Sequence, residues 1–252
     1  MKAIVLCAGY GTRLGSLTRE VPKPMLGIGD SPLLEHTLRH IAEHGFREMV
    51  VNLHFQAEQI SSYFGDGSRF GIRLHYVYEP ELLGTAGAVK NIASFLRGSE
   101  PFLVHYGDIL TNQDFTAMLA HHRERRALAT LLLHQRQKSN SVVHLDYQGR
   151  VLAFWERPSE VPLEISKPYV FSGVCLCEPE FIDRIPEGPC DLPRDLFSQM
   201  AAGAPIYGYA LTGYRCAIDS PQRLEEARQA VADGKFQPYR RSQDHVAASA
   251  RI

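Results

Sequence analysis

The residues best suited to chemistry lie near the start of the chain. Gly9 and Gly11 follow a short apolar run, and the basic residues Arg13 and Lys23 come soon after them. Glycines let backbone N–H groups approach an anion closely, and N–H groups placed close together in a turn form an anion-binding concavity. Arg13 adds a planar fork of donors, and Lys23 adds a mobile point charge. The spacing therefore predicts a site that holds a polyphosphate.

Two common glycine loops do not fit this stretch. The dinucleotide pattern G-x-G-x-x-G needs glycine where the chain has Leu14, and the P-loop pattern G-x-x-x-x-G-K-[ST] does not occur. The stretch instead resembles the signature of the sugar-1-phosphate nucleotidyltransferases, A-G-x-G-T-R-L…L-T…P-K-P-M. The matching positions are Ala8, Gly9, Gly11, Thr12, Arg13, Leu14, Leu17, Thr18, Pro22, Lys23, Pro24 and Met25. The alternative is a strand and loop with fortuitous basic residues, which so long a compound motif disfavours.

The resemblance implies a role for each part of this stretch. It places Arg13 on the β- and γ-phosphates of a nucleoside triphosphate and Lys23 on the α-phosphate, both as catalytic residues. The residues expected to bind the nucleotide here are Leu6, Ala8, Gly9, Gly11 and Thr12.

A second glycine loop resembles the family's base-recognition loop, commonly L-G-T-A-G-A. It is Gly84-Thr85-Ala86-Gly87, and Glu79 precedes it. The glycines would let main-chain groups reach a flat base, and Glu79 would accept hydrogen bonds from ring N–H or amino donors. We therefore expect Glu79, Gly84 and Thr85 to bind the nucleotide. The alternative, that the loop is the cap and first turn of a helix, is compatible with this role.

Gly107-Asp108 resembles the glycine and aspartate that end the family's central strand. We expect Gly107 to contact the nucleotide and Asp108 to act in catalysis as a ligand of Mg²⁺. Mg²⁺ usually keeps several waters and is held by one or two carboxylates together with substrate phosphates. The alternative is that Asp108 caps the following turn.

The residues expected to bind the sugar phosphate lie later in the chain. Glu156-Arg157 occurs where the family usually has E-K-P, so the charge is kept while an ammonium is exchanged for a guanidinium fork. Ser172 and Gly173 stand where many relatives carry N-A-G, and the change removes an amide. For Glu156 and Arg157, a solvated ion pair at a strand end is the alternative.

The chain departs from the family pattern near its end. The pattern is roughly G-Y-W-x-D-x-G-T-P, and here Ala217 occupies the position of the carboxylate while Asp219 follows two residues later. Residues two apart on an extended segment face the same side, so Asp219 is a candidate second metal ligand. Alternatively, Asp219 caps the helix expected at 221–232, with Ser220 as the competing cap.

The elements that must position these residues alternate along the first half of the chain. Strands are expected at 2–7, 48–53, 74–78 and 101–106, and helices at 32–44, around 60–64 and at 86–96. Strands separated by single helices indicate right-handed crossovers and an α/β fold with a doubly wound, mainly parallel, Rossmann-like sheet. Such sheets bind ligands beyond the carboxyl ends of their strands, so the strand ends should meet at one edge.

After residue 134 the pattern changes to short strand-like runs with a turn at Gln148-Gly149, which predicts an added antiparallel lobe over the sugar side. We expect a single domain at 1–237, in which 1–134 binds the nucleotide and 135–237 binds the sugar phosphate. Residues 238–252 form a polar tail.

Composition limits the partners. The 252 residues have a formal net charge of −1, so there is no broad basic field, and neither nucleic acid nor membrane is expected as a partner. No stretch approaches 18 consecutive apolar residues, and the first residues lack the apolar run of a signal peptide, so a cytoplasmic protein is expected. The five cysteines include no C-x-x-C pair, which favours buried thiols over zinc or disulfides. Homo-oligomerisation is left open.

Taken together, these motifs predict an enzyme that condenses a nucleoside triphosphate with a sugar 1-phosphate, with Mg²⁺ as cofactor. GTP is favoured because a carboxylate can accept from both N1–H and the amino group of guanine. UTP and dTTP remain alternatives, since 65–71 and 171–173 resemble uridylyltransferases acting on amino-sugar phosphates. A non-catalytic sensor of nucleotide sugars is the alternative from another class, and cytidylyl transfer to a non-sugar phosphate is a weaker one.

Overall fold

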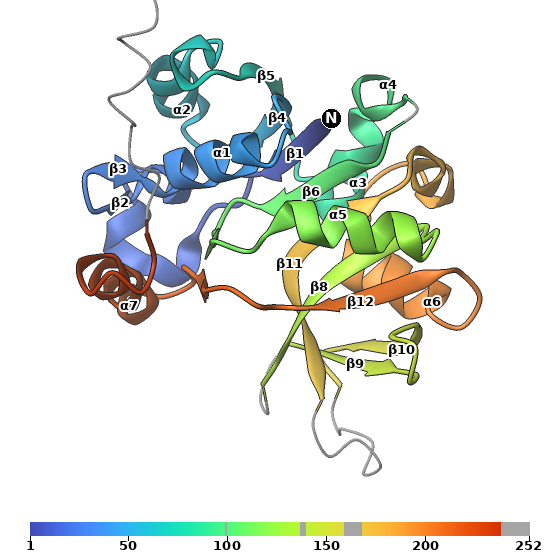
Figure 1. Cartoon of the computed structure of the whole chain (residues 1–252). Helices are drawn as coiled ribbons and strands as arrows, with labels where there is room; N and C mark the ends of the chain where they lie inside the picture. The colour runs from blue at the N-terminus through green and yellow to red at the C-terminus, as the bar shows by residue number, and fades with distance from the viewer. Residues whose placement is uncertain (99, 137–139, 159–167, 238–252) are drawn as a thin grey trace, which may run out of the picture.

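A nine-stranded sheet forms the centre of the protein in the computed structural model, which describes residues 1–98, 100–136, 140–158 and 168–237 (Figure 1). The strands run in the order β10-β9-β11-β6-β1-β4-β5, with β8 paired to β11 and β12 paired to β8. Their bounds are β1 (Lys2–Leu6), β4 (Glu48–Leu53), β5 (Arg73–Tyr78), β6 (Phe102–Tyr106), β8 (Ala129–Gln135), β9 (Ser141–Leu145), β10 (Val151–Glu156), β11 (Tyr169–Cys177) and β12 (Ile206–Ala210).

Helices cover both faces of this sheet because its central strands are apolar on both sides. In β1, Ile4 belongs to one buried cluster while Ala3 and Val5 belong to the other. The cluster around Ile4 includes residues of α3 (Gly84–Asn91), α4 (Ala93–Leu96) and the π-helix η5 (Leu192–Phe197), which continues into α6 (Ser198–Met200). The other cluster includes residues of α1 (Leu33–Glu43), α2 (Ala57–Phe64) and α5 (Phe115–Glu124). The predicted doubly wound α/β fold is confirmed.

The parallel core is β6-β1-β4-β5, and its strands and helices lie close to the predicted ranges. The prediction of a single helix at 86–96 is wrong. It is divided into α3 and α4 at Ile92, whose backbone has φ −108° and ψ 22°. The apolar spacing survives the break, since Ile92 and Leu96 are both buried in the same cluster.

The antiparallel part continues the main sheet. Strand β11 pairs antiparallel with both β6 and β8, and β9 and β10 form the expected hairpin beside it. The strands predicted as an added lobe are therefore joined to the nucleotide-side strands by one continuous ladder. A sheet shared in this way keeps the two parts in a fixed relation.

The end of the described chain returns to its beginning. Figure 1 shows α7 (Pro221–Ala232) beside the short strands β2 (Gly27–Ile28) and β3 (Ser31–Pro32). A third buried cluster joins them through Leu14, Ile28 and Leu224. Just before α7, β13 (Arg215–Ala217) pairs antiparallel with β7 (Ile109–Thr111), which follows β6. This packing brings the segment before α7 to the amino-terminal loop.

The remaining short helices are η1 (Thr12–Thr18), η2 (Lys23–Met25), η3 (Ser68–Phe70) and η4 (Pro179–Arg184). Within the described ranges, no helix has the length and apolar character needed to cross a bilayer. The polar tail expected at 238–252 lies outside the described residues.

Candidate active site

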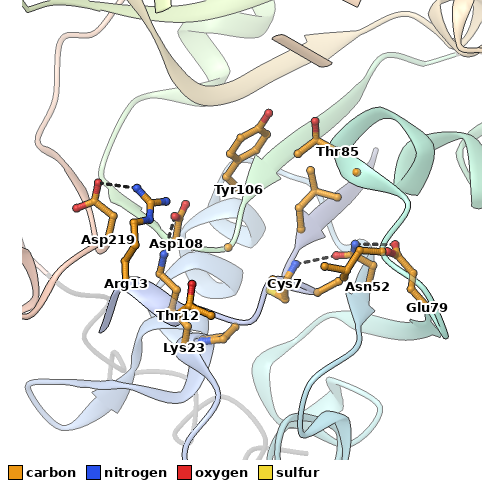
Figure 2. Close-up of a pocket in the computed structure, with 18 of the residues that line it drawn as sticks. Cys7, Thr12, Arg13, Lys23, Asn52, Glu79, Thr85, Tyr106, Asp108 and Asp219 are labelled. Carbon is orange, nitrogen blue, oxygen red and sulfur yellow. Dashed lines mark hydrogen bonds and ion pairs between the residues drawn. The ribbon is translucent and has the colours of Figure 1, made fainter. Parts of the chain in front are cut away.

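The strand ends meet at one pocket, as the doubly wound topology requires. The pocket has a volume of about 310 Å³ and is shown in Figure 2. Thirteen of the residues selected from the sequence line it, and they come from the two glycine loops, the ends of β5 and β6 and the segment before α7. These residues are Leu6, Ala8, Gly9, Gly11, Thr12, Arg13, Lys23, Glu79, Gly84, Thr85, Gly107, Asp108 and Asp219.

The two glycines of the first loop have different roles. Gly11 has a φ of +67°, in the left-handed region, and stands immediately before η1, where Thr18 Oγ1 donates to its carbonyl at 3.1 Å. Gly9 has no atom within 4 Å of the position that a Cβ would take. Gly11 is thus needed for the turn, whereas Gly9 leaves open space on the pocket wall.

Lys23 and Asp108 form the shortest charged contact in the pocket. Lys23 Nζ lies 2.7 Å from Asp108 Oδ2, and the two side chains are only 11% and 27% exposed. The carbonyl of Asp108 accepts a hydrogen bond from the backbone N–H of Ile218 at 2.8 Å. Asp108 therefore directs its side chain to Lys23, while its backbone holds the segment before α7. The described contacts of the Asp108 side chain do not cap the following turn, which was the alternative role for this residue.

Asp219 faces the pocket beside Arg13. Arg13 Nη1 lies 3.7 Å from Asp219 Oδ2, and the arginine side chain is 67% exposed. The helix cap is provided by Ser220, whose hydroxyl accepts from the backbone N–H of Arg223 at 3.2 Å. The capping alternative for Asp219 is thus wrong, and its carboxylate is available on the pocket wall.

On the opposite side of the pocket, a buried chain of hydrogen bonds joins three strand ends (Figure 2). Asn52 Nδ2 donates to Glu79 Oε1 at 2.8 Å, and Asn52 Oδ1 accepts from the backbone N–H of Cys7 at 2.7 Å. Glu79 is 1% exposed, and its other oxygen accepts from the backbone N–H of Leu83 at 3.2 Å. Each carboxylate oxygen can accept more than one bond, so Glu79 keeps acceptor capacity while it braces the loop.

The second glycine loop is fixed by a segment more than one hundred residues away. Thr85 Oγ1 donates to Asp191 Oδ1 at 3.0 Å and accepts from the backbone N–H of Leu192 at 2.8 Å. Gly84 has a φ of +72°, and a Cβ there would lie 2.5 Å from the carbonyl oxygen of Cys190. Gly84 is also the first residue of α3, so the loop is both the first turn of a helix and part of the pocket wall.

Three polar pocket residues were not selected from the sequence: Asn52, Tyr106 and Asp191. Asp191 does not cap a helix with its side chain, although it precedes η5. The Tyr106 hydroxyl is buried, and burial raises its pKa well above the ordinary value. The only feature of the sequence that could have indicated Asn52 and Tyr106 as pocket residues was their position at the ends of buried strands.

The four residues predicted to bind the sugar phosphate lie off this pocket wall. Ser172 is 0% exposed, and its hydroxyl is 2.8 Å from His134 Nδ1. Gly173 has a φ of +83° and packs against Tyr106. Arg157 is 76% exposed, with Nε 3.6 Å from Glu156 Oε1. Burial raises the pKa of Glu156, which Arg157 partly opposes. Their roles remain predictions.

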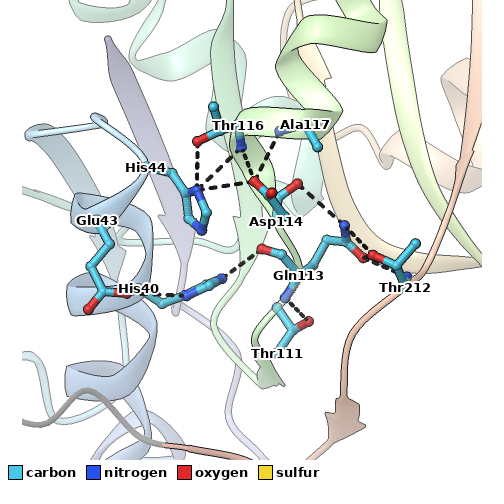
Figure 3. A network of polar contacts seen from close by, with 9 residues as sticks. All are labelled: His40, Glu43, His44, Thr111, Gln113, Asp114, Thr116, Ala117 and Thr212. Atoms are coloured by element: carbon cyan, nitrogen blue, oxygen red, sulfur yellow. Dashed lines mark hydrogen bonds and ion pairs between the residues drawn. The ribbon is translucent and has the colours of Figure 1, made fainter.

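A polar network surrounds the residues that link β7 to α5 (Figure 3). His40 Nε2 lies 2.8 Å from the carbonyl oxygen of Gln113, whose side-chain oxygen accepts from the backbone N–H of Thr212 at 2.9 Å. Asp114 caps α5 by accepting from the backbone N–H groups of Thr116 and Ala117. Burial lowers the pKa of His40 to about 4, so this ring is neutral near pH 7.

Comparison with known proteins identifies similar chains. A family model described as nucleotidyl transferase matches residues 2–194. The chain is 37% identical over 223 residues to the UTP–glucose-1-phosphate uridylyltransferase of Synechocystis, which covers 82% of this chain and 57% of that protein. It is 34% identical over 225 residues to the mannose-1-phosphate guanylyltransferase of Mycobacterium tuberculosis, covering 87% and 61%. The chain thus spans about three fifths of the length of these relatives.

Solved structures support the fold. A putative glucose-1-phosphate thymidylyltransferase from Bacillus anthracis superposes with a TM-score of 0.82 at 19% identity, covering 92% of this chain and 96% of that one. HddC from Yersinia pseudotuberculosis gives a TM-score of 0.76 at 20% identity, covering 90% and 98%.

Proposed function

Because the chain belongs to the nucleotidyl transferase family, we propose that it condenses a nucleoside triphosphate with a sugar 1-phosphate, releasing pyrophosphate and forming a nucleoside diphosphate sugar. The observation that carries this proposal is the meeting, in one pocket, of the glycine loop, the Lys23–Asp108 pair and the Arg13–Asp219 pair. These groups supply N–H donors, two cations and two carboxylates around a space open to solvent.

In the proposed reaction, an oxygen of the sugar phosphate attacks the α-phosphorus in line, and the bond to the pyrophosphate breaks. Such a transfer needs little covalent help from the protein, so its rate depends on positioning and on stabilisation of charge. Lys23 is held at the end of β6 by Asp108, where it stabilises charge developing on the α-phosphate. The Arg13 side chain is 67% exposed on the pocket wall, where it would contact the β- and γ-phosphates as they leave.

We propose Mg²⁺ as the divalent cation, held by Asp108 and Asp219. Magnesium sites of this type use one or two carboxylates together with substrate phosphates, which fits two carboxylates on the wall of one pocket. Among the described residues, no group of three or more acidic, histidine or cysteine side chains is gathered to hold a metal without substrate. When bound, the cation would neutralise charge on the phosphates.

We favour GTP as the nucleotide. Several similar proteins are mannose-1-phosphate guanylyltransferases, and Glu79 keeps acceptor capacity near the second glycine loop. UTP is the second candidate, because the Synechocystis relative, at 37% identity, is a uridylyltransferase.

The test combines the protein and Mg²⁺ with each nucleoside triphosphate in turn and with glucose 1-phosphate or mannose 1-phosphate. Pyrophosphate should appear only when a triphosphate and a sugar 1-phosphate are both present, and GTP with mannose 1-phosphate should be the most active pair. Nucleotide binding without pyrophosphate from any pair would contradict the proposal and favour a sensor.

A further inference from the structure

Arg215 is a partly buried cation. Its Nε and Nη2 atoms donate to the carbonyl oxygen of Ser172 at 3.2 and 3.1 Å, and burial lowers its pKa. It forms no ion pair with a carboxylate of any residue that the structure describes. A guanidinium has five N–H donors, so three remain beyond the two bonds to Ser172. Cations removed from water normally acquire a paired anion, because the loss of hydration is otherwise uncompensated.

The strand register places Arg215 on the same side as the pocket residue Asp219. Arg215 lies opposite Thr111 and Ala217 lies opposite Ile109, and the N–H of Ile218 extends this pairing to the carbonyl of Asp108. Alternate residues on this segment therefore share a face. Cys216 and Ile218 point the other way, into the cluster with α7. The side chain of Arg215 thus starts two positions before Ala217 and four before Asp219 on the pocket-facing side.

Its contacts locate the guanidinium between the nucleotide pocket and the antiparallel strands. Ser172, which binds it, lies in β11 next to Gly173, and a Cβ on Gly173 would be 3.3 Å from the ring of Tyr106, a pocket residue. The negative charge of Asp108 favours the protonated form of Arg215 and so opposes the effect of burial on its pKa. Asp108 is already paired with Lys23 at 2.7 Å. The charges of Arg215, Asp108 and Lys23 sum to +1. This net positive charge would attract an anion.

The surroundings add further positive charge. The pKa of His134 is lowered to about 4 by burial and then by Arg215, Arg136 and Arg223. Of these arginines, Arg223 is paired with Glu226 at 2.7 Å. By comparison, Arg157, the cation selected from the sequence for this task, is mostly in solvent and lies beside Glu156.

We propose that Arg215 binds the phosphate group of the second substrate, a phosphate monoester of a sugar, and holds it next to Asp108 for attack on the nucleotide. This inference rests on the proposed function and assigns the residue that anchors the attacking group. The fork of Arg215 fits two phosphate oxygens, as arginine does at many phosphate sites.

The test compares Arg215→Gln and Arg215→Lys with the wild type, with Arg73→Gln as a control at an exposed arginine outside the pocket. Steady-state rates of pyrophosphate release give KM for the sugar 1-phosphate and for the nucleotide, and titration calorimetry with glucose 1-phosphate and mannose 1-phosphate gives binding without turnover. Arg215→Gln should raise KM and Kd for the sugar 1-phosphate at least tenfold while KM for the nucleotide stays within twofold. Arg215→Lys, which keeps the charge, should recover part of the loss, and Arg73→Gln should change Kd less than threefold.

Other outcomes would overturn the assignment. Sugar-phosphate affinity within twofold of wild type in Arg215→Gln would do so, as would equal losses for both substrates, which indicate a structural cross-link between β11 and β13. If Arg215→Gln does not fold, Arg215→Lys must still show a selective rise in KM for the sugar 1-phosphate, or the assignment is wrong. Failure of the proposed function is separate: the wild type would then release no pyrophosphate, while calorimetry would still measure monoester binding. A wild type that binds neither sugar 1-phosphate overturns the inference as well.

Discussion

Replacing Asp108 by asparagine isolates the charge on which the proposed chemistry depends. The change keeps the shape of the side chain and leaves the backbone carbonyl, which accepts from Ile218, untouched. It removes the negative charge that lies 2.7 Å from Lys23 and faces the space assigned to the triphosphate. We therefore expect a large loss of activity with a small loss of stability.

The two effects can be estimated from the site. Removing one preorganised electrostatic group costs about 10²- to 10³-fold in kcat, and Asp108 is assigned two such tasks, so kcat should fall at least about 10³-fold. Breaking a fully buried ion pair costs about 3–5 kcal/mol, but these side chains are 11% and 27% exposed and Asn still accepts from Lys23. A loss of about 1–2 kcal/mol is expected, which lowers Tm by roughly 2–8 °C in a chain of this size.

The assay measures pyrophosphate release with the most active substrate pair, together with thermal unfolding. Asp114→Asn is the matched control, because Asp114 caps α5 and an asparagine caps a helix as well. This control should keep kcat within twofold of wild type. If Asp108→Asn retains more than about a tenth of the wild-type kcat, the assignment of Asp108 to catalysis is wrong.

Three further predictions concern the scaffold of the site. Gly107→Ala should destabilise the protein by about 1–3 kcal/mol, because the added Cβ would come within 2.7 Å of a carbonyl oxygen in β1. Gly9→Ala has open space and should keep the wild-type Tm, so equal Tm values for the two variants would contradict this reasoning. Thr85→Val removes the hydroxyl that bridges Asp191 and a backbone N–H, and should cost about 1–3 kcal/mol in urea unfolding, whereas Thr85→Ser should stay close to wild type. The free energy of unfolding should fall as pH is lowered from 6.5 towards 4, because His40 has a pKa of about 4 when folded, against an ordinary value of 6.5, so the unfolded chain takes up more protons. The slope is at most about 1.4 kcal/mol per pH unit for each such histidine, and a pH-independent urea midpoint in this range would refute the claim.

Local features of the sequence were enough to predict the parallel half of the fold and one wall of the pocket. Alternating apolar strands and helices dictate a doubly wound sheet, and that topology places the strand ends at one edge regardless of side-chain detail. For this reason the sequence alone was enough to predict that Gly9, Glu79 and Asp108, which are far apart in the chain, line one pocket.

The parts that the sequence did not reveal depend on contacts between distant residues. Thr85 and Asp191 are separated by 106 positions, and nothing in the spacing near either residue indicates that they hydrogen-bond. Asp191 stands at the N-cap position of η5, yet its carboxylate accepts from the hydroxyl of Thr85 and does not cap that helix. A side chain at a helix start does not cap the helix when the tertiary structure places another hydrogen-bond partner within its reach.

The segment before α7 illustrates how a motif can be altered without losing its place in the site. The pairing of β13 with β7 fixes which residues face the pocket, and it does so for every second position. A carboxylate moved by two residues, from 217 to 219, therefore stays on the pocket side, whereas a shift of one would have placed it in the apolar cluster with Ile218. The same rule places Arg215 on that face. The departure from the family pattern thus leaves Asp219 within reach of Arg13. Under the proposal for Arg215, it also puts a phosphate-binding cation two positions before Ala217.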